Sequence, residues 1–141
     1  DGTIPLSIPV VKANKPGQPI CETRISDHGN WRHLHWRALQ SAYGNSPFFE
    51  YYEDDFRRFY QPDWEFLTDY NRDLMTLVCE LLDITPRINN TEKFQAVPLM
   101  DFQGVAPRPY YQVFSARHGF IPDLSIVDLL FNMGPESVLY L

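Results

Sequence analysis

The chain has few of the residues that cross-link small proteins, and it has no long apolar run. Its two cysteines, Cys21 and Cys79, form neither a Cys-x-x-Cys motif nor a zinc-finger spacing, and we expect both to be free thiols. No apolar run approaches the ~20 residues that cross a bilayer, and no signal peptide is recognisable. We therefore expect a cytoplasmic protein that does not insert into membranes.

Basic residues are also scarce. The 12 lysines and arginines are outnumbered by 18 acids, which gives a net charge of −6 and a pI near 5.1. This charge repels phosphate backbones and argues against general binding of nucleic acid or anionic membranes. A local basic pocket is still compatible with the sequence, because nine of the 12 bases are arginines.

Glycine is infrequent, with seven residues, and the glycine motifs of nucleotide enzymes are missing. The sequence has no phosphate-binding P-loop, no Rossmann fingerprint and no Gly-x-Ser-x-Gly nucleophile elbow. We therefore expect no cofactor. A transferase built on this chain would need a donor that arrives already activated.

Aromatic side chains, in contrast, make up 15% of the chain. Many of them are expected in the core, because aromatic rings bury large areas. With 141 residues the chain can form a core without disulfides or a structural metal. We predict a single domain over residues 1–141.

Strands are predicted in two parts of the chain. Residues 4–11 and 20–25 flank a turn at 14–17 and predict a hairpin, whose first strand lies at an edge because of its prolines. Short strands are also expected at 94–97 and 110–114. With the helices below, these segments predict an α+β fold in which a small, mainly antiparallel sheet packs against three to four helices.

Helical periodicity is clearest after residue 30. A first helix is expected between Asn30, its N-cap, and Gly44, its C-cap. Its apolar face comprises Trp31, Leu34, His35, Ala38, Leu39 and Ala42. Further helices are expected over residues 47–60, 62–82 and 125–133. Their end signals are Ser46-Pro47 for the second helix, and a Ser125/Asp128 capping box and Gly134-Pro135 for the last.

The segment from Asp27 to Arg37 is the strongest candidate for a functional site, since it holds three of the four histidines and two of the three tryptophans. One face of the predicted helix carries His33, Trp36, Arg37 and Gln40, with Arg32 beside it. Histidine can act as a general base, arginine can bind phosphate or carboxylate, and tryptophan can stack on a sugar or base. The alternative is a solvated helix face whose Trp36 packs under a further segment.

A metal site at the histidines is not expected. Residues two apart on a helix point ~200° away from each other, so His33 and His35 cannot share an ion there. His35 belongs to the apolar face and is expected in the core or at an interface. On a strand, the same pair would suit zinc.

Acidic residues in the second helix have two interpretations. The acids are Glu50, Glu53, Asp54 and Asp55, which could serve acid–base chemistry or bind a hard cation. The pairs Glu53–Arg57 and Asp54–Arg58, however, have the i,i+4 spacing of ion pairs on a solvated helix.

Three polar residues near the C-terminus also need an interpretation. The capping box already accounts for Asp128, whose catalytic role is therefore not favoured. Asn132 is a poor helix former beside an apolar face and is a candidate to line a pocket. His118 lies on a turn before the last helix, where functional residues are common, and is a second candidate base.

Four motifs give the chain a resemblance to the WbqC-like protein family. They are DHGNWRHLHW at 27–36, SPFFEYY at 46–52, PYYQ at 109–112 and FIPDLSIVDLLFNMG at 120–134. The chain looks most like the short form found in Bacteroidetes. It lacks the family's N-terminal segment and has few residues near Met100–Asp101, so we expect missing segments at both places.

The resemblance implies a biological setting and a reaction class. Members of the family occur in gene clusters for O-antigen and other surface polysaccharides, and a glycine or aminoacyl transferase role has been suggested from that context. The resemblance brings with it no established catalytic residues.

The leading hypothesis is therefore a transferase that acts on a sugar or nucleotide sugar in surface-polysaccharide biosynthesis. Its assigned residues are His33 and His118 as bases, and Arg32, Trp36, Arg37, Gln40 and Asn132 as the substrate site. The alternative is a non-catalytic binding or assembly protein, in which the aromatic helix at 47–60 contacts a partner or a second copy of the chain. A metal hydrolase is the third hypothesis.

Overall fold

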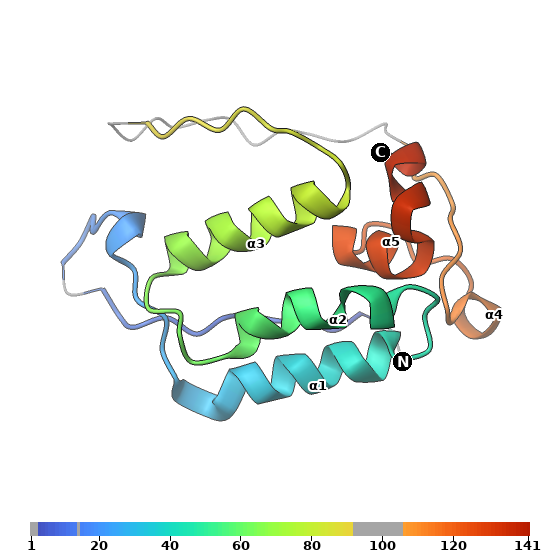
Figure 1. Ribbon diagram of the computed structural model, residues 1–141. Helices are drawn as coiled ribbons and strands as arrows, with labels where there is room; N and C mark the ends of the chain where they lie inside the picture. Colours follow the sequence, from blue (N-terminus) through green and yellow to red (C-terminus); the bar gives the residue numbers. More distant parts are fainter. Residues whose placement is uncertain (1–2, 14, 92–105) are drawn as a thin grey trace.

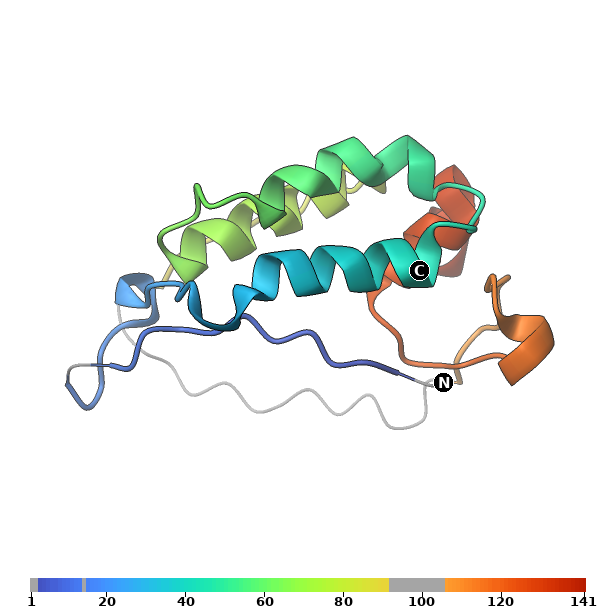
Figure 2. The ribbon, with the colours of Figure 1, turned by 90° about the horizontal axis from the view of Figure 1, so that it is seen from below.

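The computed structural model describes residues 3–13, 15–91 and 106–141, and this part of the chain is mostly helical (Figure 1). Its α-helices are α1 (Trp31–Tyr43), α2 (Phe49–Arg57), α3 (Leu67–Leu81), α4 (Ser115–His118) and α5 (Ile126–Met133). Short 3₁₀ helices are present at Ile20–Glu22, His28–Asn30, Arg58–Tyr60 and Gly134–Tyr140. Helices α1, α2 and α3 lie side by side in alternating directions, and α5 packs where α1 ends and α2 begins (Figures 1 and 2).

The predicted α+β fold with a small antiparallel sheet is wrong, because the described residues contain five α-helices and no strand. The expected hairpin is reduced to one antiparallel bridge, between Val10 and Ile25. Its first segment contains Pro5 and Pro9, which have no N–H to donate to a ladder. After Pro19 the chain closes into a 3₁₀ helix, so the second expected strand does not form either.

The strand predicted at 110–114 is not formed either. Residues 110–114 are irregular and end in a turn that leads into α4. The strand predicted at 94–97 lies outside the described residues. A sequence of alternating apolar and polar residues indicates a strand only when a neighbouring segment supplies hydrogen-bonding partners along its length.

Helix α1 begins where the sequence predicts, although its N-cap residue does not cap the helix through its side chain. Asn30 is the N-cap, but its backbone is left-handed, with φ 49°, and its side chain makes no capping hydrogen bond. The buried face consists of Trp31, His35 and Leu39. Leu34 was predicted on this face and is instead 60% exposed. The buried face is therefore narrower than the predicted one, with a period of four residues.

Helix α2 begins later than predicted because its expected cap has another partner. The Ser46 hydroxyl donates to the carbonyl oxygen of Tyr43 at 2.7 Å, so it closes the end of α1 instead of starting α2. The N-cap of α2 is Phe48, and the helix continues into the 3₁₀ helix at 58–60. The rings that this segment buries are Phe49, Phe56 and Phe59.

Helix α3 also starts later than predicted, at Leu67 rather than Pro62. The residues before it are extended and pair with the segment that leads to α1. The N–H of Ile25 donates to the Glu65 carbonyl oxygen at 2.8 Å, and the N–H of Leu67 donates to the Thr23 carbonyl oxygen at 2.9 Å. These hydrogen bonds hold the start of α3 against the start of α1.

Helix α5 supplies the centre of the core. The Phe131 ring is fully buried and lies 5.1 Å from Tyr43, 5.2 Å from Phe49 and 5.1 Å from Phe56, measured between ring centroids. The predicted stop at Gly134 is confirmed, since this residue is the C-cap of α5. The predicted C-cap of α1, Gly44, is confirmed as well.

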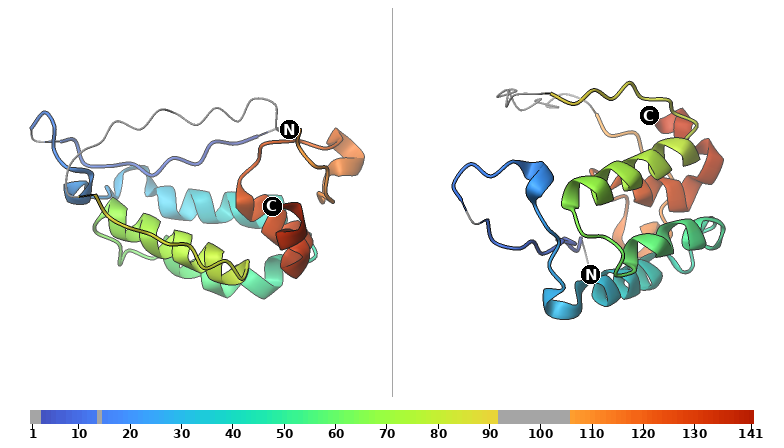
Figure 3. Two further views of the ribbon diagram at one scale, coloured as in Figure 1. Left: turned by 90° about the horizontal axis from the view of Figure 1, so that it is seen from above. Right: turned by 60° about the vertical axis from the view of Figure 1, so that its left-hand side comes forward.

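The N-terminal residues run in extended form alongside α1 (Figure 3). The His35 ring fastens them by donating a hydrogen bond to the backbone carbonyl of Ser7. No helix in the described residues has the length and apolar character needed to cross a membrane.

Candidate functional site

A polar cleft lies at the start of α1, where this helix faces the end of α2. It is open to solvent and has a volume of about 620 Å³. Its lining residues are Asp27, Asn30, Trp31, Arg32, His33, Trp36, Gln40, Arg57, Tyr60, Gln61 and Pro62. Two arginines and a histidine against one carboxylate make this lining more basic than the chain as a whole, whose net charge is −6.

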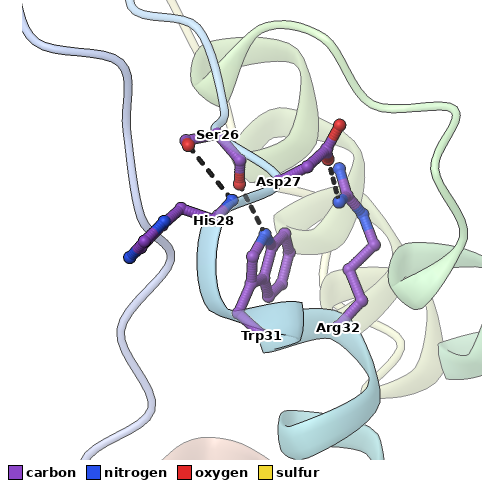
Figure 4. Close-up of polar contacts among 5 residues, drawn as sticks. All are labelled: Ser26, Asp27, His28, Trp31 and Arg32. Atoms are coloured by element: carbon purple, nitrogen blue, oxygen red, sulfur yellow. Dashed lines mark hydrogen bonds and ion pairs between the residues drawn. The ribbon is translucent and has the colours of Figure 1, made fainter.

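The turn before α1 shapes one wall of the cleft (Figure 4). Gly29 and Asn30 both have positive φ, at 75° and 49°, which bends the chain sharply before the helix. The Trp31 indole N–H donates to the Ser26 carbonyl oxygen at 2.9 Å, and the Ser26 hydroxyl accepts from the His28 N–H at 3.2 Å. The turn is therefore fastened at Ser26, one residue before Asp27.

Arg32 is the most buried charge of the cleft, with a side chain that is only 13% exposed. Its Nη1 pairs with Oδ1 of Asp27, and its guanidinium carbon lies 4.7 Å from the Trp31 ring centroid. Its Nε–H is buried and has no hydrogen-bond partner among the described residues. A buried N–H without an acceptor is costly. Nε has almost no exposed surface, so an anion reaches this donor only when the guanidinium moves.

Arg57 faces the cleft from α2 and is already paired. Its Nη2 donates to Oε1 of Glu53 at 2.8 Å, which confirms the predicted i,i+4 pair. The same carboxylate oxygen accepts from the Gln40 amide at 3.2 Å and so joins α1 to α2. The other predicted pair, Asp54–Arg58, is not seen; Asp54 lies 3.9 Å from Arg57 instead.

Trp36 forms the aromatic wall between the two helices. Its ring packs against Tyr60 at 5.3 Å and Phe49 at 6.2 Å between centroids, and the Arg57 guanidinium lies 5.6 Å from it. The indole is half-buried. The Trp36 ring therefore offers a ligand only the edge that the Arg57 guanidinium does not cover.

Tyr60 lines the cleft, and its hydroxyl is hydrogen-bonded to the buried Tyr70. Burial raises the pKa of Tyr60 to about 12, and the hydrogen bond with the Tyr70 hydroxyl lowers it in part. At neutral pH the phenol is therefore protonated and can donate a hydrogen bond.

The structure brings four of the seven predicted site residues together: Arg32, His33, Trp36 and Gln40 all line the cleft. Arg37 is exposed on the same helix and does not line it. His118 lies on α4, at the other end of the molecule (Figure 1). Asn132 is buried in α5, 2% exposed, away from the cleft.

The sequence alone does not assign Arg57, Tyr60 and Gln61 to this site. Arg57 was identified only as an ion-pair partner on α2, and the other two follow from how the 3₁₀ helix at 58–60 packs on α1. The local sequence carries no signal for that packing. The packing of α2 and of the 3₁₀ helix at 58–60 against α1 brings these residues to the same cleft as His33.

A second polar cluster lies inside the molecule and links residues 110–121 to α5. The Asp128 carboxylate is buried, and its Oδ2 accepts from the Tyr110 hydroxyl at 2.7 Å and from the Gln112 amide at 3.0 Å. The hydroxyl of Tyr43, on α1, is a third donor to Asp128. Burial, followed by this carboxylate, raises the pKa of both tyrosines.

Asn132 belongs to the same cluster. Its Nδ2 donates to the Asp128 carbonyl oxygen at 2.8 Å, and its Oδ1 accepts from the Val113 N–H at 3.0 Å. Gln112 holds the segment at a further point, because its amide donates to the Ile121 carbonyl oxygen at 2.8 Å and accepts from the Ile121 N–H at 2.9 Å. These contacts occupy both ends of each amide and indicate a structural tie.

The predicted capping box of α5 is wrong. Ser125 is the N-cap, but no side-chain hydrogen bond caps the helix. The Asp128 carboxylate faces Tyr110 and Gln112 instead, so it cannot reach back to the start of its own helix. The spacing of Asp128 and Asn132, one helical turn apart, was the available signal that both face the core.

His35 lies in the core, 9% exposed, as its place on the apolar face predicts. Its ring meets Trp31 edge to face at 5.1 Å. Burial lowers its pKa, and the hydrogen bond to the Ser7 carbonyl opposes that effect. Within the described ranges, no group of three or more His, Cys, Asp or Glu residues has the arrangement of a metal site.

Comparison with known proteins identifies one family. The model of the WbqC-like protein family matches residues 1–106 and 95–140. An uncharacterised protein of Mycobacterium tuberculosis is 29% identical over 173 aligned positions, which cover 96% of this chain and 74% of the relative. Because the chain has 141 residues, the relative carries residues that have no counterpart here. No solved structure matches the chain.

Proposed function

Because the chain belongs to the WbqC-like protein family, we propose that it is a transferase that acts on a sugar or nucleotide sugar in O-antigen or other surface-polysaccharide biosynthesis. The cleft at the start of α1 is the observation that carries the proposal. It combines a guanidinium with an unpaired buried N–H, a half-buried indole, three side-chain amides and an exposed imidazole. Ligand sites typically combine such apolar walls with a few convergent polar groups.

Five of the lining residues have a role in this proposal. Arg32 binds the diphosphate of a nucleotide sugar, since a guanidinium matches phosphate oxygens in a two-point contact. Gln40 and Gln61 offer amides to sugar hydroxyls, and the edge of Trp36 packs against the sugar ring. His33 is exposed at the cleft and is placed to accept a proton from the acceptor.

The reaction we propose is aminoacyl transfer from a donor that is already an activated ester. The sugar amine or hydroxyl attacks the carbonyl carbon of the donor and forms an amide or ester bond. The bond to the leaving group breaks, and the leaving group departs with its electron pair. His33 takes the proton that the attacking group loses, so the chain itself needs no nucleotide-activating motif.

The test is a thermal-shift screen of the protein against nucleotide sugars. A ligand at a hundred times its dissociation constant stabilises by about 2.7 kcal/mol. This corresponds to a rise in Tm of about 5–10 °C for a domain of this size. Arg32→Ala should abolish the shift, whereas Arg37→Ala, the same change on the same helix outside the cleft, should preserve it. The absence of a shift with every nucleotide sugar would contradict the proposal.

Activity gives the second test once a donor and an acceptor are identified. His33→Ala should reduce the transfer rate by about 10²–10⁴-fold, which is the range for a general base. His118→Ala is the matched control, because that histidine lies on α4 and does not line the cleft. A rate that depends on His118 and not on His33 would place the reaction elsewhere.

The alternative of a non-catalytic binding or assembly protein receives less support from α2. Its aromatic face was the predicted contact surface, but Phe49 and Phe56 are buried in the core. Only Tyr51 of that helix, 80% exposed, offers a ring fully to solvent. A mass that rises with concentration, together with no response to any sugar nucleotide, would favour this alternative.

A further inference from the structure

The Arg32–Asp27 pair is unequal in its surroundings, and this inequality has a consequence for ligand binding. The Arg32 side chain is 13% exposed, whereas that of Asp27 is 83% exposed. The poorly solvated Arg32 guanidinium is thus neutralised by the well-solvated Asp27 carboxylate. An ion pair with so exposed a partner contributes little to stability.

The turn leaves Asp27 free to move. The preceding residue, Ser26, is fastened through its carbonyl oxygen to the Trp31 indole at 2.9 Å. The Asp27 side chain, in contrast, is held by Arg32 alone among the described residues (Figure 4). A rotation of this side chain would release the guanidinium and leave the turn intact.

Arg57, the other arginine of the cleft, is a less suitable anion receptor. Its carboxylate partner, Glu53, is 24% exposed and also accepts from the Gln40 amide. Displacing Glu53 would break two contacts and the link between α1 and α2. Arg32 is therefore the arginine of the cleft whose partner is readily exchanged.

We infer that Asp27 stands in for a ligand oxyanion on Arg32 and that a phosphate or diphosphate group displaces it when it binds. The incoming group offers several oxygens to a guanidinium whose Nε–H has no acceptor, whereas Asp27 engages Nη1 through a single oxygen. Asp27 then competes with the ligand and weakens its binding. This inference deepens the proposed function, because it concerns the same cleft, but it requires only binding and no transfer.

The experiment measures the dissociation constant of inorganic pyrophosphate by calorimetry, with uridine diphosphate as a second probe. Asp27→Asn should tighten pyrophosphate binding by up to about fivefold, the equivalent of the lost competing pair. Asp63→Asn is the matched control, since Asp63 is exposed and follows Pro62 at the cleft without an ion pair to Arg32. It removes the same charge nearby and should change the constant less.

A double-mutant cycle assigns the effect to Arg32. In an Arg32→Lys background, Asp27→Asn should no longer tighten binding, because the guanidinium that Asp27 occupied is absent. In the unmutated protein, the NMR resonance of the Arg32 Nε–H should shift on addition of pyrophosphate. This measurement does not depend on whether any variant folds. A response to pyrophosphate and uridine diphosphate alike indicates a phosphate site, and a response to the nucleotide alone would overturn the displacement by phosphate.

Other outcomes would also contradict the inference. If Asp27→Asn weakens binding, Asp27 positions Arg32 and does not compete with the ligand. If Asp27→Asn and Asp63→Asn have equal effects, only the general field of the cleft is involved. The proposed function would survive either result, provided that nucleotide sugars still stabilise the protein through Arg32. Conversely, displacement by pyrophosphate without any effect of nucleotide sugars would support the inference and contradict the transferase.

Discussion

At the residue scale, Gly134 occupies a position that admits no side chain. A Cβ atom there would lie 2.4 Å from the Phe48 ring, and the backbone φ is 55°. We expect Gly134→Ala to lower the free energy of unfolding by about 2–4 kcal/mol, from overpacking and from the positive φ together. Urea or thermal unfolding measures this loss.

Gly17 provides the control for the backbone contribution. Its φ is also positive, at 75°, but no atom lies within 4 Å of the position of a Cβ. Gly17→Ala should therefore cost only the conformational part, about 1 kcal/mol. Equal losses in the two variants would show that the contact with Phe48 is relieved without cost.

His35 makes the stability depend on pH. Burial holds its pKa below the ordinary value of 6.5, so the unfolded chain binds the proton more tightly than the folded one. The contribution of the neutral His35 ring to stability is complete above pH 6.5 and is lost as the pH falls from there through the folded pKa. The measurement is the free energy of unfolding as a function of pH for the unmutated protein and for His35→Gln.

The difference between those two profiles isolates His35, because the carboxylates are common to both proteins. It should shrink as the pH falls below 6.5, since the neutral ring loses its advantage there. A difference that stays constant with pH would mean that the ring stabilises the fold equally in both protonation states.

Local sequence predicts single residues when their role depends on their own helix. The buried position of His35 and the stop at Gly134 follow from periodicity and from turn chemistry, and both are confirmed. Arg32, His33, Trp36 and Gln40 share the cleft because they lie on one side of one helix. Arg57 and Tyr60 complete it from another element, so a pattern within α1 could not include them.

At the scale of elements, the Asp128 cluster holds residues 110–121 against α5 and α1. We expect Asp128→Asn to lower the free energy of unfolding by about 2–3 kcal/mol, because it removes a charged acceptor of buried hydrogen bonds. Asp123→Asn is the control: Asp123 is exposed, and asparagine tolerates its positive φ of 58°.

Hydrogen exchange distinguishes a local effect from a global one. The amide of Val113, which is bonded to the Asn132 side chain at 3.0 Å, should exchange faster in Asp128→Asn than in the control. Unchanged protection at Val113 would mean that Asn132 holds the segment without help from the carboxylate.

The elements that the sequence predicts well are those that carry their own hydrogen bonds. A helix satisfies its backbone within itself, so the apolar faces of α3 and α5 suffice to locate them. A strand depends on a partner segment, and the prolines at 5 and 9 leave the N-terminal residues with a single bridge to Ile25. The late start of α3 has the same cause, because residues 65–67 pair across the chain before the helix begins.

At the scale of the whole molecule, the aromatic composition predicts the nature of the core. Rings from α1 and α2 converge on Phe131 of α5. Trp64, which precedes α3, stacks on Phe59 with 5.2 Å between ring centroids. The composition does not predict how these elements are arranged, since rings pack equally well between helices and on a sheet. The α+β prediction therefore failed although the prediction of an aromatic core succeeded.

The same core makes the whole molecule sensitive to alkaline pH. Burial raises the pKa of five tyrosines above the ordinary value of 10.0, and for Tyr60 to about 12. The folded protein therefore keeps these protons at a pH at which the unfolded chain releases them. Ionisation favours the unfolded state, and stability should fall as the pH rises above 10.0.

The measurement combines tyrosinate absorbance with far-ultraviolet circular dichroism during a titration to high pH. We expect only part of the tyrosine absorbance to appear while the helices are intact, and the rest to appear together with the loss of the helical signal. The buried groups lie on α1, α2, α3 and the 110–121 segment, so their ionisation and the unfolding should be one cooperative event. Complete ionisation near pH 10.0 with the helices preserved would show that water reaches these hydroxyls in the folded state.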